Sequence, residues 1–187
     1  MILSDRQIRQ ALDSGRIVIT PRPRDDQFAP SAVDLHVGAE FKRWKEPAPG
    51  PLEPLRLSEV NLPDCANLLE EMPADADGCV MVGPKHFVLA RTLERVHLPH
   101  DSRLAARVEG RSSFARLGLV VHMTAPTIHA GFAGHIVLEM MNFGPFGLRI
   151  DPERTLICQI IFEELGDDPE CAIHTAFQNQ RNVLGKG

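Results

Sequence analysis

The sequence predicts an all-β barrel or sandwich preceded by a short helix. Most apolar segments are short, alternate with polar residues at a period of two, and are separated by turns. The 15 Pro and 14 Gly favour many turns over a bundle of long helices. With 187 residues, 43% of them hydrophobic, the chain is long enough for a substantial core. We therefore expect residues 1–187 to form a single domain.

The helix is expected over residues 5–13. Ser4 and Gln7 have the spacing of a capping box, and Gly15 is placed to end the helix. A β-branched strand over residues 16–20 should follow.

Further strands are predicted where short apolar runs recur. Their expected ranges are residues 31–38, 78–82, 86–93 with 96–98, 103–108, 119–124, 134–141, 148–150 and 154–163. The 134–141 run is apolar on both faces, which is typical of a buried core strand. In 31–38, Asp34 and His36 share one face, which we interpret as a solvated or hydrogen-bonded strand face. Residues 45–57 are rich in Pro and polar residues and predict a surface excursion.

Composition narrows the class of partner and the compartment. The formal net charge of -5 argues against general affinity for nucleic acid polymers. The four Cys form no C-x-x-C pair, which indicates free thiols in a reducing compartment. No apolar run is long enough to span a bilayer, and charged residues from Asp5 onward argue against a signal peptide. We expect a cytoplasmic protein without a membrane partner.

A compact polar cluster stands out at residues 111–116. Arg111, Ser112, Ser113 and Arg116 place two hydroxyls and two guanidinium groups within six residues. Such a set suits an anion with several oxygens, because Arg binds phosphate bidentately and Ser adds short hydrogen bonds. The alternative is that both arginines are surface charges.

One carboxylate, Glu139, lies in a run that is otherwise apolar. A carboxylate in such surroundings costs free energy unless it is used. The alternatives are a catalytic group or a partner for Arg111 or Arg116. Metal ligation is a weak hypothesis elsewhere: His97 and His100 are three residues apart, but Pro99 prevents a helix that would bring them together.

Several motifs carry a family resemblance. GRSSFARLG, VHMTA and AGFAGHIVLE-x-x-N resemble the dCTP deaminase branch of the dUTPase-like superfamily. MILSDRQIRQALDSGRIVI, SAVDLHVGAEF and FVLARTLERVHLP resemble the same family in the same order, so the likeness runs from Met1 to about Glu163. It implies a distorted jelly roll that assembles as a homotrimer, with sites between subunits closed by a C-terminal tail, here residues 164–187.

The resemblance implies hydrolytic deamination of dCTP to dUTP and ammonia. Glu139 matches the family's general base and acid, a role that suits a carboxylate whose pKa burial can raise. The zinc route has an H-x-E and P-C-x-x-C signature that this sequence lacks, so no zinc is expected. Mg²⁺ would arrive with the triphosphate.

The resemblance also assigns the other site residues. Ser112 and Arg116 would hold the water and orient Glu139, and together with Arg111 and Ser113 they belong to the nucleotide-binding segment. Further substrate contacts would come from Ala125, His129, Val137 and Gln180. His122 falls where the family has a histidine beside the base pocket, but a histidine in an apolar strand is also often a core residue.

The sequence departs from the family pattern at three places. His129 replaces an Asp that in the family contacts the deoxyribose region. In dUTP-hydrolysing relatives a carboxylate at about this position also activates the water that attacks phosphorus. Ala176 replaces a phosphate-binding Lys in the tail, where Gln180 fits the pattern. Pro126 and Thr127 stand where monofunctional deaminases tend to carry His-Arg. Two alternatives therefore stay open: a bifunctional enzyme that also cleaves dUTP, against which His129 argues, and a catalytically silent nucleotide sensor. dUTP and dTTP are further candidate ligands.

Overall fold

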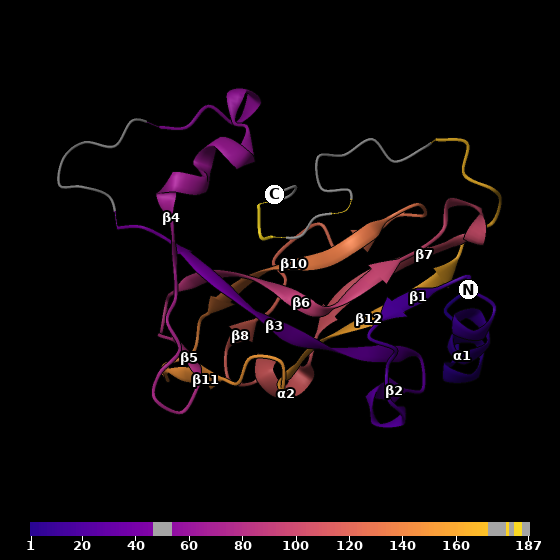
Figure 1. The fold of residues 1–187 in the computed structure, drawn as a ribbon, viewed down its shortest axis with the longest axis horizontal. Coiled ribbons are helices and arrows are strands. Elements are labelled where there is room, and N and C mark those ends of the chain that lie inside the picture. The colour runs from indigo at the N-terminus through magenta and orange to yellow at the C-terminus, as the bar shows by residue number, and fades with distance from the viewer. Residues whose placement is uncertain (47–53, 172–178, 180–181, 185–187) are drawn as a thin grey trace.

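The computed structural model describes residues 1–46, 54–171, 179 and 182–184, and it confirms the predicted all-β fold (Figure 1). One curled antiparallel sheet contains β1 (Val18–Thr20), β2 (Phe28–Ala29), β3 (Ala32–Trp44), β4 (Leu69–Glu71), β6 (Phe87–His97), β7 (Leu104–Gly110), β8 (Leu119–Val120), β9 (Thr127–Ile128), β10 (Ala133–Asn142) and β12 (Leu156–Glu164). Its main strand order is β8-β10-β6-β3-β12-β7-β9, with β1 beside β6 and with β2 and β4 beside β3. A separate two-stranded ribbon pairs β5 (Val80–Val82) with β11 (Leu148–Ile150).

The described helices are short. They are α1 (Asp5–Asp13), α2 (Ser112–Ala115) and four 3-10 segments at Asp25–Gln27, Leu57–Glu59, Leu62–Leu68 and His100–Ser102. The predicted capping box is confirmed at α1: the Ser4 hydroxyl accepts from the Gln7 backbone N–H at 3.4 Å, and the Gln7 side chain accepts from the Ser4 N–H at 2.9 Å. In the part of the chain that the structure describes, no helix has the length and apolar character of a bilayer span.

The core lies inside the curl of the sheet. Its fully buried side chains come chiefly from the long strands and from the helix α1: Ile8, Val33, Leu35, Phe41, Val88, Leu138, Met140, Ile160 and Phe162. The long strands therefore pack together through one shared apolar core on the inner face of the curled sheet. The outer face of the sheet is available for a site.

The prediction for residues 134–141 was wrong in one respect. In β10, Ile136, Leu138 and Met140 are buried, but the alternate residues Val137 and Glu139 are only half-buried. Only one face of the strand is therefore buried in the core. Glu139 stands on the other face, next to Leu89 of the neighbouring strand β6.

Two other predictions are corrected. The strand expected over residues 119–124 is limited to Leu119 and Val120, and the chain beyond it leaves the sheet. Asp34 and His36 do not form a solvated face, because both are buried. The second half of that prediction is confirmed, since both residues are hydrogen-bonded. The expected excursion at residues 45–57 lies partly outside the described residues.

Candidate active site

A pocket of about 460 Å³ opens on the outer face of β6 and β10. Its walls are mostly apolar and include Leu89, Phe132 and Val137, and its polar side chains include His122, His129 and Glu139. An apolar pocket with a few convergent polar groups is the usual form of a small-molecule site. Four of the predicted site residues, Ala125, His129, Val137 and Glu139, line this one pocket, and so does the possible site residue His122.

Glu139 and His122 face each other in this pocket. The His122 Nδ1 lies 2.6 Å from the Glu139 Oε2, and the exposed fractions of the two side chains are 8% and 35%. The two groups are not aligned for a hydrogen bond, and neither of these two buried atoms has another partner among the described residues. Buried polar atoms are nearly always satisfied, so an exception in a pocket marks a place where a ligand or water completes the bonding. Glu139 therefore pairs with a histidine and with neither Arg111 nor Arg116.

The loop between β8 and β9 forms one wall of the pocket. Ala125 adopts a left-handed backbone conformation with φ 58°, which a non-glycine residue rarely takes. The next residue, Pro126, accepts a hydrogen bond from the Val108 N–H at 3.0 Å, which ties the loop to β7. A strained backbone held at a pocket wall is typical of a functional site. His129, the residue that departs from the family pattern, is exposed and lines the same pocket.

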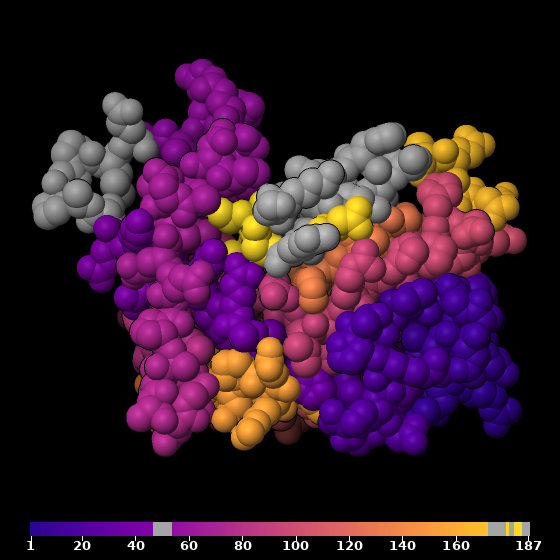
Figure 2. All heavy atoms as spheres, in the orientation of Figure 1, coloured from indigo at the N-terminus to yellow at the C-terminus, as the bar shows by residue number. Residues whose placement is uncertain are grey.

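The C-terminal residues reach the same pocket. Val183 and Leu184 are buried against Leu69 and Leu89, and both line the pocket. Figure 2 shows yellow atoms of the C-terminal segment next to the purple segment that contains Leu62–Leu68 and β4. Gln180, predicted to contact the substrate, and Ala176 lie outside the described residues.

The predicted anion-binding cluster lies on and around α2. Ser112, Ser113 and Arg116 are exposed, and Arg111 is half-buried at the start of the helix. The turn after the helix is fixed by a close backbone approach: Gly118 has φ 94°, and a Cβ there would stand 2.3 Å from the Gly144 nitrogen. Only glycine fits this position, which explains the second glycine of the motif.

Within one chain, the structure does not bring together the two predicted parts of the site, which are the anion-binding cluster at residues 111–116 and Glu139. None of Arg111, Ser112, Ser113 and Arg116 lines the pocket that contains Glu139. In Figure 1, α2 lies at the lower edge of the molecule, whereas the C-terminal residues that line the pocket lie at the upper side. A single chain thus presents an apolar pocket with a carboxylate and, elsewhere, an exposed set of anion-binding groups.

Beside the pocket, burial lowers the pKa of His135, and the positive charges of Arg91 and Arg95 lower it further. No group of three His, Cys, Asp or Glu side chains in the described ranges is placed to hold a metal ion. His100, considered above as a weak ligand candidate, instead faces the carbonyl oxygen of Cys171 at 3.1 Å.

Sequence reasoning missed two groups of site residues. The apolar lining from distant segments, such as Trp44, Leu62 and Leu184, has no local signal, because only the sheet pairing and the chain path bring these residues together. It also missed that Asp34 contacts Arg111, with 3.4 Å between Oδ2 and Nη2. The available signal was that Asp34 and His36 share the face of the strand opposite Val33 and Leu35.

Comparison with known proteins identifies the class. The family model for dCTP deaminase-like proteins matches residues 2–165, so the chain belongs to the dCTP deaminase-like family. It is 39% identical over 169 residues to the dUMP-forming dCTP deaminase of Methanosphaera stadtmanae, covering 90% of this chain and 82% of the relative. It is 39% identical over 168 residues to the dCTP deaminase of Rhodospirillum rubrum, covering 88% and 83%.

A solved structure agrees on the fold. The crystal structure of 2'-deoxycytidine 5'-triphosphate deaminase from Agrobacterium tumefaciens superposes with a TM-score of 0.64 at 23% identity, covering 86% of this chain. The match covers 47% of that longer protein, so this chain spans about half of its length. At this identity the likeness shows the shared fold.

Proposed function

We propose that the protein deaminates dCTP by hydrolysis, releasing ammonia and dUTP, with Glu139 as the general base and acid. The observation that carries the proposal is the Glu139 carboxylate in an apolar pocket, 2.6 Å from His122 and without another partner among the described residues. Family membership and the named relatives support dCTP as the substrate.

The reaction needs one group that moves protons in both directions. Glu139 takes a proton from water, and the resulting hydroxide attacks C4 of the cytosine ring while the C4–N3 π electrons pass to N3. Glu139 returns the proton to N3. It then takes the proton of the C4 hydroxyl and passes it to the amino group, so that the C4–N4 bond breaks, ammonia leaves and the remaining oxygen becomes the 4-oxo group. A carboxylate within hydrogen-bond reach of the water suits each transfer. His122 orients the carboxylate from its buried side.

The triphosphate is bound by the cluster on α2. Arg111 and Arg116 supply fork-shaped cations, and Ser112 and Ser113 supply hydroxyl donors. Because none of the four lines the Glu139 pocket, we propose a homotrimer in which each site combines the pocket of one subunit with the cluster of the next. Ser112 and Arg116 would then reach the water beside Glu139 from the neighbouring subunit.

Mg²⁺ is proposed to enter with the substrate. The phosphate oxygens and water are the ligands this cation prefers. The protein is proposed to act in the cytoplasm.

A second candidate is the bifunctional reaction that ends in dUMP and pyrophosphate. Relatives named as dUMP-forming dCTP deaminases, such as that of Methanosphaera stadtmanae, favour it. His129 opposes it, because an imidazole is a poor substitute for a carboxylate that activates water for attack on phosphorus.

One incubation separates the candidates. Purified protein with dCTP and Mg²⁺ is assayed for ammonia, dUTP, dUMP and pyrophosphate, with dUTP alone as a parallel substrate. The proposal expects ammonia and dUTP in equal amounts; dUMP and pyrophosphate would establish the second candidate.

Glu139→Gln tests the catalytic role. We expect turnover to fall at least about a hundredfold because the proton carrier is lost, with dCTP affinity changed by only a few-fold. Turnover near that of the wild type would contradict the role of Glu139, and an inactive wild-type protein that still binds dCTP would indicate a sensor.

A further inference from the structure

Arg111 is held by two groups of the sheet. Its Nη1 donates to the carbonyl oxygen of Leu156 at 3.2 Å, and its Nη2 lies 3.4 Å from the Asp34 Oδ2. Neither contact uses the Nε–H. Arg has five N–H donors in a rigid fork, so the guanidinium keeps donors for an anion while its plane is fixed. The Arg111 side chain is 32% exposed, so part of it is accessible to a ligand.

A local irregularity in the sheet lies next to the Leu156 carbonyl. Between β12 and β3, Leu156 pairs with His36 and Cys158 pairs with Leu35, so the register shifts at Ile157. A bulge of this kind interrupts the ladder and re-aims backbone groups. Here it coincides with the carbonyl that accepts from Arg111.

Asp34 is itself rigidly held. Its side chain is 11% exposed, and its Oδ1 accepts a hydrogen bond from Gln159 Nε2 at 2.9 Å. Its backbone carbonyl accepts from Gln27 Nε2 at 2.9 Å. One oxygen of the carboxylate is thus anchored to β12, and the other is aimed at Arg111.

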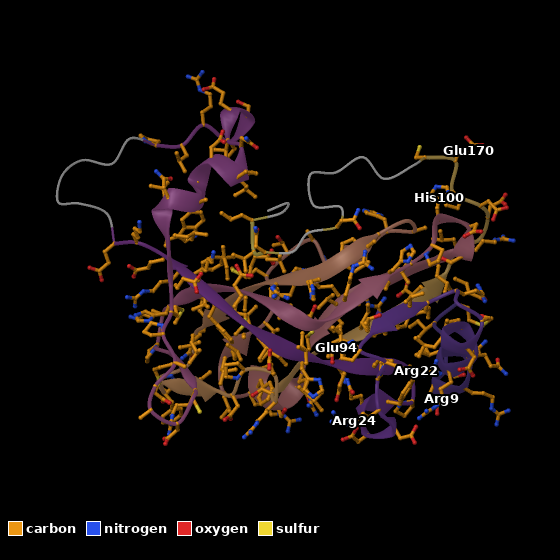
Figure 3. All side chains as sticks on the ribbon, viewed as in Figure 1. Arg9, Arg22, Arg24, Glu94, His100 and Glu170 are labelled. Atoms are coloured by element: carbon orange, nitrogen blue, oxygen red, sulfur yellow. The ribbon has the colours of Figure 1, made fainter. Side chains whose placement is uncertain are left out.

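A buried polar layer stands behind Asp34. Glu94 is 1% exposed and accepts from the His36 backbone N–H at 2.9 Å, from Gln27 at 3.2 Å, and lies 2.7 Å from His36 Nδ1. Figure 3 shows Glu94 beside β3 in the body of the molecule, in contrast to Arg9, Arg22 and Arg24 at its periphery. Gln27 and Glu94 both hydrogen-bond to the backbone of β3, at Asp34 and His36, so this layer fixes the backbone from which Asp34 projects.

We propose that Asp34 is a positioning residue for nucleotide binding, acting through Arg111. With Leu156 and Gln159 it fixes the guanidinium plane in the orientation that receives phosphate oxygens, so that this side chain does not have to be ordered when the nucleotide binds. The inference rests on the proposed function only in that Arg111 is taken as a nucleotide ligand.

A competing physical effect points the other way. Asp34 brings a negative charge close to an anion site, and its removal alone would strengthen the attraction of phosphate. Positioning therefore predicts weaker binding after loss of the carboxylate, whereas simple charge compensation predicts tighter binding. The direction in which the dCTP dissociation constant changes therefore distinguishes positioning from charge compensation.

The test is a double-mutant cycle with Asp34→Asn and Arg111→Gln in the full-length protein. The dCTP dissociation constant is measured by calorimetry with Mg²⁺, and kcat and KM by ammonia release. We expect Asp34→Asn to raise the dissociation constant and KM about tenfold and to change kcat less than about threefold. In the Arg111→Gln background the same change should have less than about a twofold effect, because the side chain through which it acts is gone.

Two further variants complete the design. Gln159→Leu releases the Asp34 carboxylate while keeping its charge, so it should weaken dCTP binding a few-fold and again only when Arg111 is present. If Asp34→Asn does not fold, Gln159→Leu can be used in its place to test the inference. Asp75→Asn is the matched control, because Asp75 pairs with Arg149 at 2.9 Å beside the β5–β11 ribbon, and it should leave the dissociation constant unchanged.

Three results would overturn the inference: additive effects in the cycle, a lower melting temperature with unchanged dCTP affinity, or tighter binding by Asp34→Asn. Failure of the proposed function looks different. A wild-type protein that binds dCTP without turnover, but gives a non-additive cycle in the binding measurement, would remove the deaminase assignment and leave the positioning role standing.

Discussion

Replacement of Asn142 should destabilise the protein strongly, because one buried amide joins three backbone segments. Asn142 is fully buried. Its Nδ2 donates to the Val82 carbonyl at 3.0 Å and to the Phe146 carbonyl at 2.8 Å, and its Oδ1 accepts from the Gly144 N–H at 3.0 Å. It therefore connects the end of β10 to β5 and to the loop that follows.

The magnitude follows from these three hydrogen bonds. At a net contribution of about 1 kcal/mol each, Asn142→Ala should lower the free energy of unfolding by about 3 kcal/mol. For a chain of this size, that corresponds to a fall in melting temperature of about 6–12 °C. The loop also supports α2, since the Phe143 N–H donates to the Gly118 carbonyl at 2.8 Å. We therefore expect weaker dCTP binding at temperatures where the variant is still folded.

The assay is equilibrium unfolding in urea at one fixed protein concentration, because association of the proposed trimer would contribute to the apparent stability. Asn61→Ala is the matched control, since Asn61 makes an exposed side-chain bond to Asp64 at 3.0 Å and should cost less than about 0.5 kcal/mol. A loss below about 1 kcal/mol for Asn142→Ala would refute the reasoning that these hydrogen bonds act together.

Two further predictions concern assembly and pH. Arg116→Ala and Glu139→Gln should each be inactive alone, but trimers assembled from an equal mixture should recover about a quarter of wild-type turnover, because in the proposed homotrimer each site combines residues of two neighbouring subunits. A mixture that stays inactive would place both residues in one subunit's site. For His135, burial lowers the folded-state pKa below the unfolded value near 6.5, so the unfolded chain binds more protons below that pH. The free energy of unfolding should therefore fall as pH drops below about 6.5, and His135→Gln should flatten that part of the curve; an unchanged slope between pH 7 and 5 would contradict the assignment.

Local signals in the sequence predicted most elements correctly. The helix α1 was predictable because Ser4 and Gln7 cap it within one turn and Gly15, with φ 78°, ends it. The strands with clear alternation were also found, since the period of two depends only on neighbouring residues. The predicted strand boundaries were wrong where pairing between strands, and not the local sequence, decides how far a strand extends. β3 continues past Gly38 to Trp44 through charged residues, because Lys42 and Arg43 find partners on β4.

The site was predictable in its residue types and only partly in its arrangement. Glu139 was recognisable because a single carboxylate interrupts an apolar run, but the same run concealed that this strand has an open face. Its neighbour in the pocket, His122, comes from a segment that leaves the sheet after Val120, so alternation carried no information about their contact. The two are brought together by the pairing of β8 with β10, through Val120 opposite Met141.

The separation of residues 111–116 from the Glu139 pocket has a structural cause, which supports the proposed assembly. β7 carries residues 111–116 away from the sheet at Gly110, and the contact of Gly118 with Gly144 fixes the return of the chain. None of the cluster's residues lines the pocket of its own chain, while Asp34 and Leu156 hold the guanidinium of Arg111. Ser112, Ser113 and Arg116 are exposed, and exposed polar and charged groups stabilise a fold little. The cluster becomes useful when a second subunit supplies the pocket, and the mixed-trimer experiment measures that dependence directly.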